Sequence, residues 1–566
     1  MPNPASSEVV APEQLALQRL YHWEREAPGR VVLTQPLGGG KLRDFTWGEV
    51  VDEVRRMAAH LQSLGFPPGS RVALLAKNSA HWLLADFAIW MAGHVSVPLY
   101  PTLAAATIRQ ILEHSEARLL FVGKLDGWEA MRPGVPASMP CIGLPLAPPN
   151  DYPQWDWVVA ATAPLAGHPV RPGDELSTII YTSGTTGIPK GVMHSFATFA
   201  WALGTGLRRV PLGSDARILS YLPLAHVAER AIVEHALLAS GMHVYFAESL
   251  DTFTADMQRA RPTVFFSVPR LWVKFQQAVE AKMPAAKLRR LLRIPIVGRL
   301  VAKKVLAALG LDACTYAVGG AAPMPPELLR WYTRLGLTIA EGYGMTENCA
   351  VSHATFPDAP RPGTVGKPYD GIESRIDPAT GEVQMRAPCV MLGYYKEPEL
   401  TRQAFTEDGW LRTGDKGELD SEGNLRITGR IKDLFKTSKG KYVAPAPIED
   451  RLVMNGAVEA CVVVGANLGH PVGIVMLNAD AAKRSTQPES RAALEASLSS
   501  HLASINEGLD PHEQLECLVV VAEPWSVENG FITPTFKVKR NRIEEAYGPL
   551  FERWTATRRA VVWHPA

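Results

Sequence analysis

The stretch at 181–192 combines glycines, hydroxyl side chains and a lysine in an order that suits a polyphosphate. It continues a β-branched run at 178–181, which predicts a strand. Glycine permits backbone conformations that turn successive N–H groups into one concavity, and such a nest binds anions. The residues of this candidate phosphate loop are Thr182, Ser183, Gly184, Thr185, Thr186, Gly187 and Lys190.

The loop does not have the spacing of a Walker A motif. That motif requires Ser or Thr directly after its lysine, whereas Gly191 follows Lys190 here. Composition alone also leaves a flexible surface loop open, because Gly, Ser and Thr runs commonly form one. The order of the residues favours the phosphate-binding interpretation.

The run YTSGTTGIPKGV at 181–192 resembles the phosphate-binding signature of the adenylate-forming superfamily. This superfamily comprises acyl-CoA synthetases, luciferases and peptide-synthetase adenylation domains. Further motifs follow in family order over nearly the whole chain, in forms similar to those of long-chain fatty-acid–CoA ligases. The resemblance implies ATP-dependent activation of a fatty acid to acyl-AMP with release of pyrophosphate, followed by transfer of the acyl group to CoA.

Two segments carry the resemblance for the acyl group. The run SYLPLAHVAER at 220–230 resembles the second family motif, which implies that His226 lines the acyl pocket near the reacting carboxylate. The run VPRLW at 268–272 resembles the gate of long-chain synthetases, which implies that Trp272 closes an acyl tunnel. A structural role in the core remains the alternative for each of these two side chains.

Two further segments carry the resemblance for the nucleotide and the metal. The run at 319–323 resembles the segment that packs on the adenine, with Gly319 also counted as a substrate contact. In the run at 342–347, Tyr343 is similar to the residue that stacks on the base, Thr346 to the one that bonds the α-phosphate, and Glu347 to the Mg²⁺ ligand. A divalent ion with oxygen ligands would offset charge on the phosphates. The remaining residues assigned to the nucleotide are Gly320, Ala321 and Gly344.

The run LRTGD at 411–415 resembles the motif that binds the ribose. Asp415 would accept hydrogen bonds from both ribose hydroxyls, for which a carboxylate has the necessary pair of acceptor oxygens. Arg430 is similar to a second ribose or phosphate contact. An ordinary turn aspartate is the alternative for Asp415.

The C-terminal segment at 530–540 resembles the motif that bears the adenylation lysine. Lys537 has the family's Lys-x-x-Arg spacing to Arg540, and Lys539 is its competitor. The lysine would neutralise charge on the leaving phosphates. The resemblance further implies rotation of the small domain about Lys432 between two geometries. In the second geometry, the loop at 436–442, with Lys439 and Gly440, would line the channel for the pantetheine arm of CoA.

The order of the expected strands and helices that position these residues predicts an α/β fold. Strands and helices alternate in two runs, at 71–122 and 218–267, and this rhythm favours largely parallel sheets covered by helices. The Pro-rich run at 131–173 predicts a long irregular connection. We expect a large N-terminal domain at 1–429 with a small β-rich subdomain at about 366–429, a hinge at 430–433, and a mobile α+β domain at 434–566.

Composition limits the class of protein. The chain has 566 residues, of which 46% are hydrophobic and 20% charged, as in folded globular proteins. Its net charge of +1 predicts no overall attraction to nucleic acid. Its six cysteines are scattered without metal-ligand spacing, which predicts a reducing compartment and no structural zinc. With no visible signal peptide, we expect a cytoplasmic enzyme that uses ATP, Mg²⁺ and CoA, as a monomer or a homodimer.

The stretch at 282–304 is rich in lysine and arginine, with leucine, isoleucine and valine between them and no acidic residue. It predicts either peripheral contact with the inner face of a membrane or a solvated basic face. Pro295 should interrupt any single helix here.

Three other functions remain open at this point. One is an acyl-AMP ligase that delivers to the pantetheine of a carrier protein, and another is a CoA ligase for medium-chain or aromatic acids. The third is a regulatory relative that binds acyl or nucleotide ligands without turnover. The presence of Lys190, Glu347, Asp415 and Lys537 argues against this third function.

Overall fold

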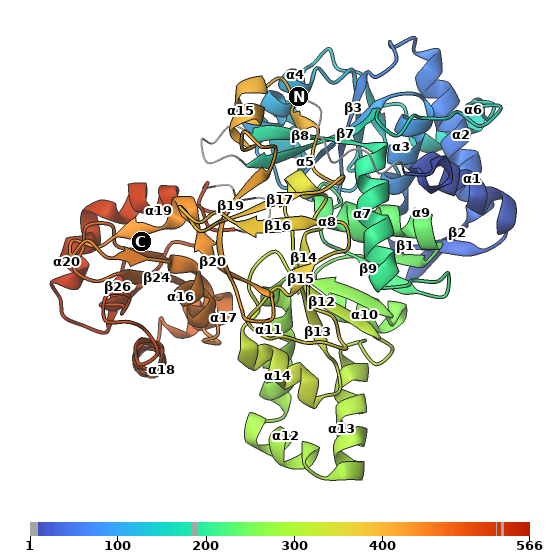
Figure 1. The fold of residues 1–566 in the computed structure, drawn as a ribbon. Coiled ribbons are helices and arrows are strands. Elements are labelled where there is room, and N and C mark those ends of the chain that lie inside the picture. The colour runs from blue at the N-terminus through green and yellow to red at the C-terminus, as the bar shows by residue number, and fades with distance from the viewer. Residues whose placement is uncertain (1–9, 184–188, 528, 534–536, 566) are drawn as a thin grey trace.

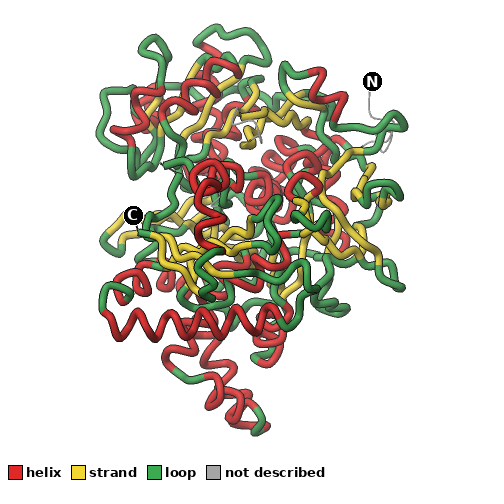
Figure 2. The backbone as a smooth tube through the Cα atoms, turned by 90° about the vertical axis from the view of Figure 1, so that its left-hand side faces the viewer, coloured by secondary structure: helices red, strands yellow, loops and turns green. Residues whose placement is uncertain are grey.

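The computed structural model describes residues 10–183, 189–527, 529–533 and 537–565. The N-terminal part of the chain builds a large body of sheets and helices, and the C-terminal part builds a smaller body beside it (Figure 1). A pair of helices projects from the large body, as the turned view also shows (Figure 2). No helix of the described ranges has the length and apolar character needed to cross a membrane.

The strands on either side of the candidate phosphate loop belong to a seven-stranded sheet in the order β18-β8-β7-β4-β3-β5-β6. Strands β4, β3, β5 and β6 are parallel, and β7 pairs in parallel with β4. Strands β7 and β8 then form an antiparallel pair that encloses the loop. The bounds are β3 (Arg71–Leu75), β4 (Val95–Leu99), β5 (Leu119–Val122), β6 (Cys141–Gly143), β7 (Leu176–Ser183), β8 (Pro189–Ser195) and β18 (Gly393–Tyr394).

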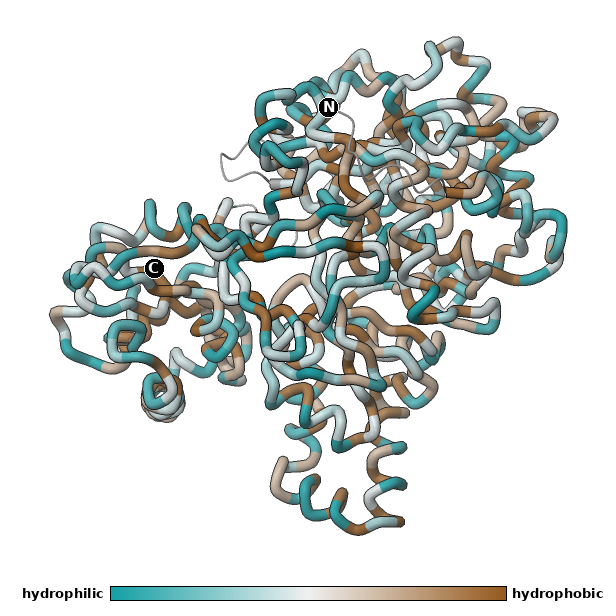
Figure 3. Tube along the Cα trace, viewed as in Figure 1, coloured by the Kyte–Doolittle hydropathy of each residue, from teal (hydrophilic) through white to brown (hydrophobic). Residues whose placement is uncertain are grey.

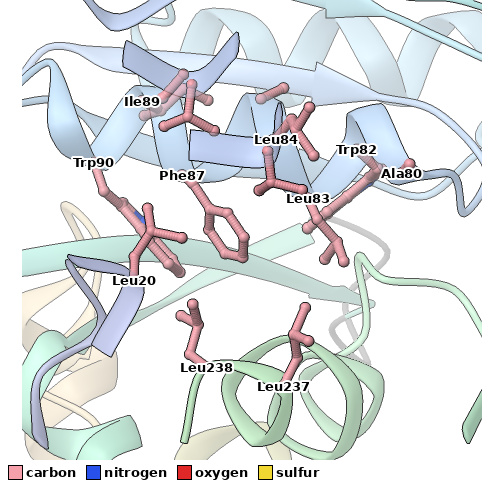
Figure 4. Close-up of a cluster of buried hydrophobic side chains, with 14 of the residues drawn as sticks. Leu20, Ala80, Trp82, Leu83, Leu84, Phe87, Ile89, Trp90, Leu237 and Leu238 are labelled. Carbon is pink, nitrogen blue, oxygen red and sulfur yellow. The ribbon is translucent and has the colours of Figure 1, made fainter. Parts of the chain in front are cut away.

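Helix α3 (Ala80–Met91) forms the centre of the largest core. Every residue of this helix is buried, because neighbouring helices and the sheet surround it. Trp82, Phe87 and Trp90 lie near Leu20 of α1 (Ala16–Glu26) and Leu237 of α9 (Ala236–Ser240) (Figure 4). Its apolar sequence therefore reflects burial inside protein.

A second sheet positions the nucleotide motifs. Strands β11 (Val264–Ser267), β12 (Tyr316–Gly320) and β13 (Ile339–Tyr343) are parallel, and the short β14 (His353–Ala354) and β15 (Lys367–Pro368) complete the sheet. The predicted segments 319–323 and 342–347 thus follow neighbouring strands at the same edge, where parallel sheets bind ligands. A third sheet, in the order β2-β1-β10-β9, comprises β1 (Val31–Gly38), β2 (Lys41–Thr46), β9 (Arg217–Ser220) and β10 (His243–Phe246).

The region after 366 forms an antiparallel sheet, as its short strands and turns predicted. It comprises β16 (Glu373–Ile376), β17 (Glu382–Arg386), β19 (Leu411–Leu419) and β20 (Leu425–Arg430). Asp415 and Arg430 are directly paired in the register of β19 and β20.

The C-terminal body has its own sheet and cores. Strands β23 (Val458–Val464), β24 (Val472–Leu477), β25 (Cys517–Val521) and β26 (Val561–His564) carry α18 (Pro488–Asn506) on one face and α19 (Arg540–Tyr547) on the other. Val463 packs in the core that contains Leu498, whereas Val462 packs with Ile543. This alternation follows from the period of two in a strand.

Two expectations about elements were wrong. The connection at 131–173 contains β6 and helix α6 (Trp155–Ala161), since the fully buried Trp155 anchors this segment and its indole N–H donates to Glu53 Oε2 over 2.8 Å. Within the alternating run at 218–267, the sequence predicts one helix over 229–239, whereas the structure divides this segment into α8 (Val227–Glu229), a π-helix η3 (Arg230–His235) and α9. The π-helix holds Arg230 against Asp86 and Glu234, both fully buried.

The projecting pair consists of α12 (Ala285–Leu292) and α13 (Pro295–Ala308), which follow α11 (Pro269–Lys282). Pro295 begins α13 and separates the two helices, as predicted.

Candidate active site

A cleft of about 2290 Å³ lies where the large body meets the C-terminal body. Its lining includes Lys190, His226, Glu347, Asp415 and Lys537, which come from distant parts of the sequence. The structure thus brings these predicted site residues to one cavity. Further predicted residues line the same cleft, namely Thr182, Gly320, Ala321, Tyr343, Gly344, Thr346, Arg430 and Lys432.

One corner of the cleft is built around the carboxylate of Asp415. Tyr343 Oη donates to Asp415 Oδ2 over 2.7 Å, and Arg430 Nε lies 3.3 Å from Oδ1. Burial raises the pKa of Asp415, and the charge of Arg430 opposes this rise. The carboxylate is therefore fixed beside an aromatic ring, an arrangement that suits a nucleoside.

Gly344 directly follows this ring and permits a close approach of two chain segments. A Cβ atom at Gly344 would lie 2.3 Å from the backbone carbon of Ala350. The backbone could not avoid this contact without moving, so a larger residue would displace the loop that carries Thr346 and Glu347.

Tyr394 contacts both Lys190 and Glu347. Tyr394 Oη donates to Glu347 Oε1 over 2.7 Å, and Lys190 Nζ lies 4.7 Å from the centre of the Tyr394 ring. Burial lowers the pKa of Lys190, and the charge of Glu347 opposes this change. One cation and one carboxylate thus face the cleft close together.

The residues present fit a magnesium ion that is bound mainly by its substrate. Mg²⁺ retains several waters and uses one or two carboxylates together with phosphate oxygens. Glu347 supplies a carboxylate beside Lys190, and no cluster of three or more His, Cys, Asp or Glu side chains suited to a metal occurs in the described ranges. A metal cage made of protein alone is therefore not found in these ranges.

His194 supports the loop that carries Thr346. Its Nε2 lies 2.7 Å from the carbonyl oxygen of Thr346, and the side chain is fully buried. Burial lowers the pKa of His194 to about 4, although the bond to Thr346 acts in the opposite direction. The ring is neutral at pH 7 and must carry its proton on Nε2 in order to donate to the carbonyl.

His226 is held in one orientation at the start of α8. Its Nδ1 accepts a hydrogen bond from the Ala228 backbone N–H over 3.2 Å. Burial, with a smaller contribution from the charge of Lys537, lowers the pKa of His226 to about 4. The neutral ring therefore carries its proton on Nε2, which makes that nitrogen a donor.

Glu229 stabilises the loop before His226 through hydrogen bonds. Its carboxylate accepts from the hydroxyl of Ser220 over 2.9 Å and from the backbone N–H of Tyr221 over 3.0 Å. Asn78 ties the same loop through its side-chain oxygen, which accepts from the Leu224 N–H over 3.1 Å. Burial raises the pKa of Glu229 to about 8.

Lys537 reaches the cleft from the C-terminal body. Its backbone N–H donates to Thr533 Oγ1 over 3.0 Å, and Arg540 behind it donates to Glu449 Oε1 over 2.7 Å and to the carbonyl of Val463. Burial between the two bodies lowers the pKa of Lys537 to about 8, with a smaller effect of Arg430 in the same direction. Its side chain still contacts solvent in the cleft, which limits this effect.

Other predicted residues lie elsewhere. Trp272 is fully buried against Phe265 and Tyr332 and is not among the described residues that line the cleft. Gly319 is also outside the lining. Lys439 is exposed with Nζ 3.2 Å from His470 Nε2, and Gly440 beside it has the left-handed φ of 74° that favours glycine.

The centre of the predicted phosphate loop lies outside the described residues. Gly184, Thr185, Thr186 and Gly187 belong to this part, and no side-chain description covers Ser183. The flanking Thr182 and Lys190 are opposite each other in the register of β7 and β8.

Sequence reasoning missed three residues of the site. His194 shares a strand face with Lys190 at a spacing of four, so the period of two could have revealed it. Tyr394 and Glu449 belong to remote segments, and no local pattern connects them to Lys190 or Lys537.

Comparison with known families identifies the architecture. Residues 20–395 match the family described as AMP-binding enzyme, and residues 432–555 match the AMP-binding enzyme C-terminal domain. The chain belongs to the AMP-binding enzyme family. This membership confirms the resemblance to the adenylate-forming superfamily.

Curated relatives of this AMP-binding enzyme cover most of its length. The long-chain-fatty-acid–CoA ligase FadD15 of Mycobacterium bovis is 32% identical, over 93% of this chain and 95% of its own. The peroxisomal long chain acyl-CoA synthetase 6 of Arabidopsis thaliana is 30% identical, over 90% of this chain and 81% of its own.

Solved structures share the fold. The anthranilate CoA ligase AuaEII in complex with anthranoyl-AMP superposes with a TM-score of 0.76 at 22% identity, over 94% of this chain and 97% of its own. The A domain of a carboxylic acid reductase from Segniliparus rugosus, in complex with AMP and a co-purified carboxylic acid, gives a TM-score of 0.78 at 22% identity, over 96% and 94%. These likenesses confirm the fold class of a large N-terminal α/β domain with a small C-terminal domain.

Proposed function

We propose that this AMP-binding enzyme is an AMP-forming fatty-acid–CoA ligase with a preference for long chains. The observation that supports it best is the convergence of Lys190, His226, Glu347, Asp415 and Lys537 on one cleft. The names of the relatives, which are a long-chain-fatty-acid–CoA ligase and a long chain acyl-CoA synthetase, agree with this assignment.

An apolar part of the cleft supports a fatty acid as the substrate. It belongs to the same cleft lining as His226 and comprises side chains from α7 (Phe196–Arg209), from the loop after it, from the π-helix and from β11. Apolar surface of this kind favours burial of methylene groups. The lining residues here include Leu203, Leu207, Val210, Leu212, Ile232 and Val264.

In the proposed first reaction, the fatty-acid carboxylate attacks the α-phosphorus of ATP and pyrophosphate leaves. His226 donates from Nε2 to the carboxylate and so orients it, and Asp415 holds the ribose. Lys537 and Lys190 offset the charge that develops on the phosphates. Magnesium, when bound beside Glu347, supplies further neutralisation of phosphate charge.

In the proposed second reaction, the CoA thiol attacks the acyl-AMP carbonyl and AMP leaves. We assign the hinge to Lys432 within 430–433, between domains at 1–429 and 434–566. Rotation there withdraws Lys537 and brings Lys439 and Gly440 to the pantetheine channel. Their position outside the described lining of the present cleft is consistent with a role in another geometry.

The partners in this proposal are a fatty acid, ATP and CoA, with peripheral membrane contact through 282–304. The gate role of Trp272 has less support, because this residue packs in the core.

Release of pyrophosphate and AMP, measured with acids from acetate to stearate and with or without CoA, tests the function. We expect multiple turnovers only with CoA and the highest kcat/KM with long-chain acids. A single turnover that stalls despite CoA would indicate a carrier-protein acceptor, and a preference for medium-chain or benzoic acids would reject the chain-length assignment. No release with any acid would reject the enzyme.

A further inference from the structure

The projecting hairpin of α12 and α13 carries a surface that the proposed chemistry does not use. It projects beyond the sheets in two views (Figures 1 and 2). Its base is anchored in the core, where Leu288 and Val305 are buried in the cluster that contains Phe275. Its turn is tight, since a Cβ at Gly298 would lie 2.7 Å from the carbonyl oxygen of Leu292. The hairpin is therefore an ordered part of the fold.

Large apolar side chains are exposed around the turn of this hairpin. The exposed fraction is 47% for Ile294, 76% for Ile296, 39% for Val297 and 65% for Leu300. Single exposed apolar residues are ordinary, but four of them within 294–300 on a projection indicate an interaction site. We refer to these four residues as the apolar tip.

Exposed cations lie before, within and after the apolar tip in the sequence. Hydrophobic and hydrophilic residues alternate along the hairpin (Figure 3), and no acidic residue occurs between 281 and 311. In the described part of the chain, none of these cations has a carboxylate within salt-bridge distance. The eight exposed cations are Lys282, Lys287, Arg289, Arg290, Arg293, Arg299, Lys303 and Lys304.

We propose that the apolar tip inserts into the interfacial region of an anionic lipid bilayer while the cations contact lipid phosphates. A soft bilayer accepts a convex apolar projection, whereas a protein partner would need a matching groove. The phosphates of nucleic acid would pair with the cations, but the isoleucine and leucine side chains would remain exposed to water. Apolar insertion and attraction to anionic headgroups reinforce each other at such an interface.

This inference rests on the peripheral membrane contact of the proposed function and deepens it, because it names the apolar tip, the cations and an anionic bilayer. A bilayer also holds long-chain fatty acids, so an enzyme docked on it would meet its substrate at a high local concentration. The hairpin contact itself does not depend on which acid is activated.

Flotation of the full-length protein with lipid vesicles tests the proposal. We use vesicles of phosphatidylcholine alone and of phosphatidylcholine mixed with phosphatidylglycerol, at low and high salt. We expect at least about tenfold stronger partitioning onto the anionic vesicles at low salt, because each lysine or arginine near the surface contributes to binding. High salt should weaken that preference through screening.

Two variants separate the contributions of tip and cations. Ile296→Asp with Leu300→Asp should reduce partitioning by about tenfold or more, because the apolar contact is lost. Lys303→Glu with Lys304→Glu should abolish the preference for anionic vesicles. The matched controls are Leu250→Asp, at a side chain that is 93% exposed, and Lys41→Glu with Lys483→Glu, all in other parts of the chain.

The proposal is overturned if the wild type does not float, if it floats equally with both kinds of vesicle, or if the tip variant floats like the wild type. The midpoint of thermal unfolding, measured on the same preparations, shows whether each variant is folded. Neither flotation nor unfolding depends on turnover, so failure of the enzyme assignment would leave the vesicle result interpretable.

Discussion

At the scale of single residues, Lys537 is the group whose charge matters most to the proposed first reaction. It stands close to Arg430 and Asp415 in the cleft, so its charge is subject to both. Lys537→Ala should lower the rate of pyrophosphate release by about 100-fold or more, the scale of losing one preorganised electrostatic group. The same variant should form acyl-CoA from supplied acyl-AMP with a much smaller loss. Lys539→Ala is the matched control, and a larger loss in this control would transfer the role to Lys539.

The pKa of Lys537, lowered to about 8, predicts an alkaline limit of the adenylation reaction. Below this pH the ammonium group is charged and can offset phosphate charge, whereas above it the neutral amine cannot. The kcat/KM for ATP should therefore fall as the pH rises through about 8, since this parameter reports groups of the free enzyme. Lys537→Arg should move that fall to higher pH, because arginine stays charged. An unchanged profile in this variant would assign the titration to another group.

At the scale of elements, the π-helix η3 fixes a buried charge network beneath the cleft. Arg230 contacts Asp86 and Glu234, and its Nη1 donates to the Thr178 hydroxyl on β7 over 2.8 Å. Arg230→Met would leave two buried carboxylates without their cation. We expect a loss of about 3–5 kcal/mol in the free energy of unfolding, measured in urea.

A combined variant provides the control for this network. Arg230→Met with Asp86→Asn and Glu234→Gln removes all three charges together, so its loss should be smaller than that of Arg230→Met alone. Equal losses would show that shape, and not charge, dominates at this position.

Elements were predictable where local pattern and tertiary environment agree. The parallel strands around α3 and the break at Pro295 follow from apolar runs and from proline chemistry. The π-helix was not predictable, because a partner on α3 holds Arg230 in place. Similarly, β6 could not be predicted, because it is only Cys141–Gly143 and forms by pairing with the edge of β5.

The residues of the site also divide into those that could be predicted from the sequence and those that could not. Lys190, Glu347, Asp415 and Lys537 lie in motifs of recognisable order, and the structure places them around one cleft. Their supporting partners could not be predicted, since the contacts of Tyr394 and Glu449 form only in the folded chain. Trp272 shows the converse, because its motif suggested a gate while its packing places it in a core.

At the scale of the whole molecule, an ion-pair contact between α11 and β23 links the two bodies. Arg270 forms an ion pair with Glu459 of β23, and Lys274 Nζ lies 3.7 Å from the same carboxylate. Arg270 and Lys274 belong to α11 of the large body. The contact therefore favours the geometry in which Lys537 occupies the cleft.

Glu459→Gln should lower adenylation relative to transfer from acyl-AMP to CoA. Partly exposed ion pairs contribute up to about 1 kcal/mol, which corresponds to a change of up to about fivefold in the ratio of the two rates. Stopped-flow measurement of each half-reaction provides that ratio. Glu489→Gln, at an exposed glutamate of α18, is the control. A lower rate of both half-reactions in equal measure would contradict a role in domain position.

The two-residue strand β18 affects when the site can be completed during synthesis of the chain. It adds Tyr394 to the edge of β8, so the side chain that contacts both Lys190 and Glu347 comes from a segment that the ribosome makes much later than β8. Contacts between such distant segments form slowly. A nascent chain that has emerged only through the second sheet would hold most of its core and yet lack a finished anion site. The capacity to retain a nucleotide would thus be acquired late during synthesis, after the bulk of the large body has folded.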